Sequence, residues 1–165
     1  NAIDAAVATG FALAVTLPRA GNIAGGGFML VHLADANEQV FIDYREMAPA
    51  AASRDMFLNE DGTVNKRKAY NSVSAAGIPG TVAGLIHALE QYGTLDLKTV
   101  MQPAIDLAEN GFAVPAALHL NLRSAAKRLG RNEEANRVYL GGTGTAPAMG
   151  TLFKQPDLAA TLKRV

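Results

Sequence analysis

The segment Gly21–Ala50, GNIAGGGFMLVHLADANEQVFIDYREMAPA, carries the strongest structural signal in this chain. Apolar residues fill 28–33 and 40–42, and the more polar segment 34–38 lies between them. Two apolar runs joined by a short polar loop are typical of a β-hairpin. The sequence therefore predicts two antiparallel strands that begin directly after a run of glycines.

A charged cluster follows the second apolar run. Shortly before Pro49, the chain places Asp43, Tyr44, Arg45 and Glu46. A guanidinium at the edge of a buried sheet is suited to binding a carboxylate through two hydrogen bonds, which makes Arg45 a candidate binding residue. An internal ion pair with Asp43 or Glu46 is an equally good explanation of Arg45. For these two carboxylates we favour an orienting or neutralising role over general-base chemistry.

Length and composition limit the possible functions. A chain of 165 residues is long enough for one domain with a sizeable core. Its formal net charge of zero gives no electrostatic reason to expect nucleic acid or anionic lipid as a partner. The sequence contains no cysteine, which excludes disulfides, cysteine-ligated zinc and cysteine nucleophiles.

Helical patterns cover most of the chain outside the hairpin. Asn1 is suited to cap a helix that Pro18 ends, and apolar residues on every face of this helix predict packing on several sides. The apolar stretch 2–17 is shorter than a membrane span requires, which favours a core helix. Later helices are expected over 79–93, over 96–110 with a kink or break near Pro103, from Pro115 to Leu129, and from an Asp157 cap onward.

Weaker signals occur between the hairpin and these helices. The sequence suggests a short helix over 54–58, a polar loop over 59–71 and a short strand over 72–78. Glycines 141, 142, 144 and 150 indicate a mobile loop. The first residue is not Met and the last helix has no stop signal, so we expect both ends to be cut from a larger protein.

Common catalytic motifs are missing or out of context. The run Gly25–Gly27 follows a helix and opens a strand, the reverse of a phosphate loop, so close backbone approach explains it better. Histidines 32, 87 and 119 have no metal-ligand spacing, and no serine lies in a G-x-S-x-G elbow. Two basic clusters are most simply solvated surface: residues 66–68, and Arg123, Lys127, Arg128 and Arg131.

Two long phrases resemble the opening of the γ-glutamyltranspeptidase family, also called glutathione hydrolases. They are NAIDAAVATGFALAVTLPRAGNIAGGGFML and IDYREMAPAAASRDMF. Further matches are GIPGTVAGLIHALEQYGTLDL and VMQPAIDLAENGFAV, and the resemblance weakens over 120–150. Because the phrases are long and occur in order, the resemblance is specific.

This resemblance implies an α+β fold that is helix-rich after the first hairpin and forms part of the α/β/β/α sandwich of N-terminal-nucleophile hydrolases. Residues 1–165 would be a single partial domain from the early large subunit of a self-cleaving precursor. In this family the N-terminal threonine of the small subunit attacks the γ-glutamyl amide. The arginine of the D-x-R-E-M-A-P motif binds the α-carboxylate of the donor, and that arginine corresponds to Arg45.

The sequence departs from the family at one motif. A threonine pair followed by histidine marks the processing site, and here Thr143 and Thr145 lie in the unrelated context GGTGTAPAMG. We therefore expect no nucleophile, metal or cofactor in this chain and no turnover by it alone. Half a sandwich would also leave apolar sheet and helix faces exposed.

The resemblance also implies partners and a compartment. The small subunit of the same precursor is the expected protein partner. Glutathione or other γ-glutamyl compounds are the expected donors, and acceptor amino acids, peptides or water are the expected second substrates. A periplasmic or secreted location is implied by the family alone.

Two alternatives remain open from the sequence. A β-lactam side-chain acylase of the same superfamily would act on a glutaryl amide, which also offers a carboxylate to Arg45. A non-catalytic binding or assembly module would keep the fold without the chemistry. A Thr-Thr-His motif downstream in the coding sequence would argue against the second alternative.

Overall fold

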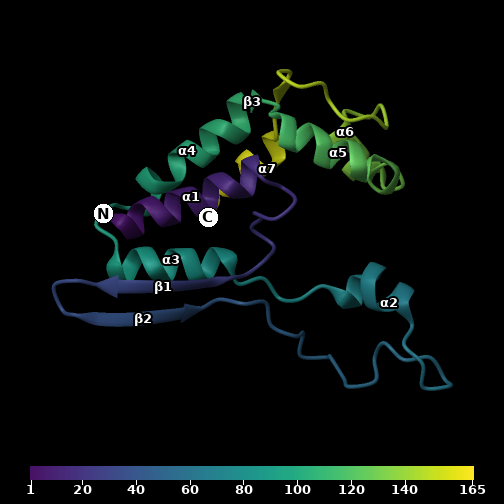
Figure 1. Cartoon of the computed structure of the whole chain (residues 1–165), viewed down its shortest axis with the longest axis horizontal. Helices are drawn as coiled ribbons and strands as arrows, with labels where there is room; N and C mark the ends of the chain where they lie inside the picture. Colours follow the sequence, from purple (N-terminus) through teal and green to yellow (C-terminus); the bar gives the residue numbers. More distant parts are fainter. The chain divides into compact units, whose positions relative to one another are not determined.

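A computed structural model describes residues 1–165 as an α+β chain (Figure 1). The chain divides into two compact units. The helical unit joins residues 1–22 to 88–165, and the hairpin unit is the continuous segment 23–87. Helix α3 (Thr81–Tyr92) contributes residues to both. The expectation of one partial domain over 1–165 stays a prediction.

The first helix, α1 (Ala2–Thr16), begins as predicted. The Asn1 side chain accepts hydrogen bonds from the backbone N–H groups of Ile3 and Asp4, at 2.8 and 2.9 Å. Its buried apolar residues lie on one stripe: Val7, Phe11, Ala14 and Val15. Leu13 is exposed, so the predicted packing on several sides is wrong for this chain. The other elements cover only part of the apolar surface of α1.

Helix α4 (Leu97–Asn110) packs against both α1 and α7 (Pro156–Leu162). Asp96 caps α4, and the helix runs through Pro103 without the break that the sequence suggested. Residue 155, not Asp157, is the N-cap of α7, and Asp157 lies in the first turn. The buried Gln155 side chain donates to the Val15 carbonyl at 2.8 Å, which ties α7 to α1.

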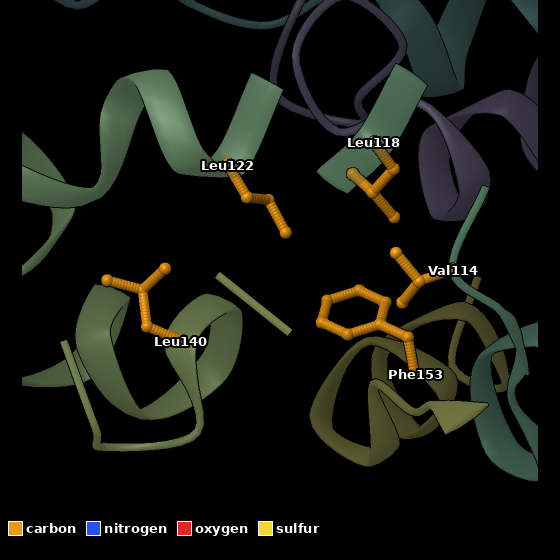
Figure 2. Close-up of a cluster of buried hydrophobic side chains, with 5 residues drawn as sticks. All are labelled: Val114, Leu118, Leu122, Leu140 and Phe153. Atoms are coloured by element: carbon orange, nitrogen blue, oxygen red, sulfur yellow. The ribbon is translucent and has the colours of Figure 1, made fainter. Parts of the chain in front are cut away.

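A second core of the helical unit lies between α5 (Ala116–Leu129) and α6 (Glu133–Leu140). Figure 2 shows five buried side chains converging there: Val114, Leu118, Leu122, Leu140 and Phe153. Phe153 belongs to β4 (Leu152–Phe153), which pairs with β3 (Phe112–Ala113). Helix α5 was predicted from the sequence, whereas α6 and this two-residue ribbon were not.

The hairpin unit contains the predicted strands, β1 (Phe28–Leu33) and β2 (Glu38–Asp43), in an antiparallel pair (Figure 1). Burial alternates along the strands: Val31 and Ile42 are buried, whereas Leu30 and its partner Phe41 are 71% and 61% exposed. The expectation of an exposed apolar sheet face is confirmed here.

The rest of the hairpin unit differs from the prediction. No helix forms over 54–58, and α2 (Lys66–Asn71) occupies the end of the expected polar loop. In place of a strand over 72–78 there is a short 3₁₀ turn, η1 (Val73–Ala75), followed by a single bridge between Ile78 and Met47. No helix has the length and apolar character needed to cross a membrane.

Asp4 joins the start of α1 to the loop between α3 and α4. Its carboxylate is buried and accepts hydrogen bonds from the Thr94 hydroxyl at 2.6 Å, the Thr94 N–H at 2.8 Å and the Leu95 N–H at 3.2 Å. The Asn1 nitrogen lies 2.9 Å from Asp4 Oδ2. Hydrogen bonds from the Thr94 hydroxyl first, and from the backbone N–H groups of Thr94 and Leu95, hold the pKa of Asp4 far below its usual range.

We expect Asp4→Asn to destabilise the folded protein most at neutral pH. Because the pKa of Asp4 is lowered in the folded state, its carboxylate stabilises the fold above the ordinary aspartate pKa. That contribution is lost as pH falls below about 4. Thermal unfolding of the full-length protein at several pH values measures it. Asp106→Asn, on the exposed face of α4, is the control. If the stability difference between Asp4→Asn and the unsubstituted protein does not become smaller as pH falls, this assignment is contradicted.

Candidate functional site

Arg45 lies just after β2, on the surface of the hairpin unit. Its side chain is 63% exposed, so the guanidinium is not enclosed in the protein interior. Neither the cavity of about 530 Å³ beside α5 nor that of about 430 Å³ beside α6 includes it. The structure therefore presents Arg45 as an open cationic group rather than as the wall of a closed pocket.

Three neighbours orient the Arg45 side chain and its peptide. Asp43 Oδ1 accepts the Arg45 backbone N–H at 3.0 Å. Glu46 Oε2 lies 3.2 Å from Arg45 Nε, and the guanidinium carbon lies 5.7 Å from the ring centre of Phe28. Phe28 in turn stacks on Phe41, with ring centres 5.5 Å apart. Within this chain, no partner engages the two terminal NH₂ groups of Arg45.

These contacts bear on the two explanations that the sequence left open. An ion pair with Glu46 does form, but it uses only Nε and is exposed to solvent, where such pairs contribute little to stability. Asp43 binds a backbone N–H rather than the guanidinium. The arrangement leaves the two-point hydrogen-bonding edge of Arg45 free for a carboxylate.

Two glycines directly before β1 hold the peptide that precedes Arg45. A Cβ added at Gly26 would lie 2.5 Å from the Tyr44 carbonyl oxygen, and one at Gly27 would lie 2.9 Å from the Tyr44 ring. Gly27 and Tyr44 also exchange two backbone hydrogen bonds, at 3.0 and 3.3 Å. The expectation of close backbone approach at the glycine run is thus confirmed, because any side chain at Gly26 would separate these backbones.

Two glycines from a distant segment also lie against Tyr44. A Cβ at Gly80 would collide with the Tyr44 carbonyl, and a Cβ at Gly84 would collide with Cβ and Cγ of the Tyr44 side chain. Gly80 N–H also donates to the Gly25 carbonyl at 2.9 Å. We call these four glycines, 26, 27, 80 and 84, the glycine clamp. It fixes the backbone from which the Arg45 side chain extends.

The second half of the clamp, Gly80 and Gly84, was not predicted from the sequence. Gly80 and Gly84 are four residues apart and therefore lie on one face at the start of α3. That spacing of small residues is the signal that could have indicated a close approach by another segment.

The remaining candidates show no shared site. His32 and His87 are exposed, and His119 Nδ1 lies 2.8 Å from the Pro147 carbonyl oxygen. No group of three or more His, Cys, Asp or Glu side chains could hold a metal ion. Thr143 and Thr145 bond to each other at 2.9 Å in the turn after α6, which is a local structural role.

Comparisons with known proteins agree over the whole chain. The sequence profile of the family described as Gamma-glutamyltranspeptidase matches residues 1–165. The chain is 46% identical to the glutathione hydrolase proenzyme of Escherichia coli (strain K12), over all of its own length. It spans 28% of the length of that relative.

Solved structures give the same result for the fold. The Helicobacter pylori γ-glutamyltranspeptidase has a TM-score of 0.95 and 45% identity, over 99% of this chain and 47% of its own. A cephalosporin acylase from Bacillus halodurans has a TM-score of 0.83 and 26% identity, over 99% of this chain and 31% of its own. The predicted α+β fold of the N-terminal-nucleophile hydrolases is confirmed.

We expect Gly84→Ala to destabilise the full-length protein, because the new methyl group would displace the Tyr44 side chain. Overpacking of this kind costs about 1–3 kcal/mol. Urea unfolding measures the change. Gly130→Ala is the matched control, since its Cβ would lie 3.2 Å from the nearest atom, the Ala126 carbonyl oxygen. Equal stabilities of the two variants would show that the clamp does not constrain Tyr44.

Proposed function

We propose, given that this chain belongs to the gamma-glutamyltranspeptidase family, that it is the part of a γ-glutamyltransferase or glutathione hydrolase that binds the donor's α-carboxylate. Arg45 is the residue assigned to that role. The nucleophilic threonine lies outside residues 1–165, on the small subunit of the same precursor. Residues 1–165 alone are accordingly inactive.

One observation carries this proposal: an exposed arginine whose terminal NH₂ groups are free, on a peptide that close backbone contacts hold in place. Glu46 and Phe28 restrict the guanidinium without occupying its outer edge. A carboxylate can then bind through two parallel N–H···O hydrogen bonds. A lysine at this position would offer a single ammonium without the planar fork.

Arg45 would act by positioning. By fixing the α-carboxylate, it would place the γ-amide of the donor where the threonine hydroxyl of the other subunit can attack. The amide C–N bond then breaks, the leaving amine takes a proton, and a γ-glutamyl ester of the threonine forms. Water hydrolyses this ester to glutamate, or an acceptor amine takes the γ-glutamyl group. A periplasmic or secreted location, as in the sequence-based expectation, is part of the same proposal.

A second candidate function has specific support. The similarity to a cephalosporin acylase suggests a glutaryl amide as an alternative substrate. A glutaryl group lacks the α-amine but keeps the carboxylate that Arg45 would bind. Identity is higher to the glutathione hydrolase proenzyme, at 46%, than to this acylase, at 26%, or to the acylase ACY 1 proenzyme of Pseudomonas sp. (strain V22), at 38%, so we favour the γ-glutamyl donor.

We expect Arg45→Lys in the full-length enzyme to raise KM for a γ-glutamyl donor. Loss of two-point charged hydrogen bonding would weaken donor binding by about ten- to a hundredfold. Steady-state kinetics with a γ-glutamyl anilide measures KM and kcat. Arg54→Lys is the control, because Arg54 is an exposed arginine paired only with Asp55. Unchanged KM in Arg45→Lys would refute the assignment of this residue.

Substrate preference separates the two candidate functions. The full-length enzyme should cleave γ-glutamyl anilide with a higher kcat/KM than glutaryl anilide. The reverse preference would favour the acylase. Arg45→Lys should impair either reaction, so this comparison tests the substrate independently of the residue.

A further inference from the structure

The helical unit contains a groove that the proposed function does not use. The groove has a volume of about 530 Å³ and lies between α5, α6 and the segment after α1. Leu118 and Leu122 of α5 line the groove but are already buried, at 4% and 5% exposure. Its partly exposed apolar surface comes from Pro18, from Leu129 of α5 and from Tyr139 of α6. Its size is within the range of sites that hold a ligand or several side chains of a partner.

The charge on this groove is of one sign. Arg19 and Arg128 both line it, and no acidic residue does. Arg19 donates only to the neutral side chain of Asn121, at 2.9 Å, and Arg128 has no ion pair in this chain. Helix α5 itself contains no Asp or Glu. These two arginines therefore form a cationic rim on an apolar floor, without an internal counter-charge.

Such a surface fits an occupant that combines apolar side chains with carboxylates. Burying the partly exposed surface of Pro18, Leu129 and Tyr139 favours an apolar occupant, and two uncompensated guanidinium groups favour an anionic one. A peptide segment with acidic residues beside apolar ones satisfies both demands.

The lengths of the relatives indicate where such a segment would come from. This chain corresponds to 47% of the Helicobacter pylori polypeptide that it matches, so more than half of that polypeptide lies outside the matched region. A segment of the same polypeptide is present at high effective concentration and needs less intrinsic affinity than a separate partner.

We propose that this groove is the docking site for an acidic, partly apolar segment of the same polypeptide beyond residues 1–165. Docking there would neutralise Arg19 and Arg128 and cover the apolar floor between α5 and α6. The interface is separate from the carboxylate site assigned to Arg45, and it does not depend on the reaction that the enzyme catalyses.

Cysteine labelling tests this proposal in the full-length protein, because residues 1–165 contain no cysteine. Ser124→Cys places a thiol in the groove, and Arg123→Cys places one on a different face of the same helix. Maleimide labelling at each site is followed by peptide mass spectrometry. We expect the groove thiol to react at least about tenfold more slowly, since the docked segment must open locally first. Equal labelling rates at the two thiols, whether both fast or both slow, would overturn the proposal.

Charge reversal tests the acidic character of the occupant. Arg19→Glu with Arg128→Glu should restore fast labelling of Ser124→Cys. Lys127→Glu with Arg131→Glu, the same charge change outside the groove, should not. Protection that survives reversal of the two groove arginines would overturn the proposed chemistry. Protection that falls on dilution would identify a second copy of the protein as the occupant and overturn the assignment to the same polypeptide.

Discussion

The close approach of three backbone segments around Tyr44 is the constraint on which the candidate site depends. Gly26 and Gly80 approach the Tyr44 peptide more closely than any Cβ allows, and Gly84 does the same against its side chain. The peptide is therefore held by two segments that are more than fifty positions apart in sequence. An arginine on a mobile loop would lose conformational entropy when it bound a carboxylate. An arginine on a fixed peptide loses less conformational entropy on binding.

Local sequence signals predicted the hairpin and most helix ends. Strand β1 has the predicted bounds because its apolar run lies between a glycine run and a polar turn, which mark its two ends. The Asn1 cap and the Gly111 end of α4 were predictable because capping depends on neighbouring residues. Arg45 could be selected from a short motif for the same reason, although its role remains a proposal.

Features that depend on distant contacts were not predictable. The ribbon of β3 and β4 has two residues per strand, which is too short for any periodicity. Ile78 forms one bridge to Met47 rather than a strand, because the next residues turn into α3. The second half of the glycine clamp was missed since nothing near Gly80 in the sequence shows that Tyr44 lies against it.

The hydrogen bonds of Asp4 have a consequence for the order of folding. Its partners, Thr94 and Leu95, lie 90 and 91 residues later in the chain. During synthesis, α1 leaves the ribosome long before the loop that completes its contacts. The intervening segment 23–87 is continuous and can organise its own contacts first. Helix α1 thus reaches its final environment only after that loop has been made, a delay that non-local contacts impose on folding.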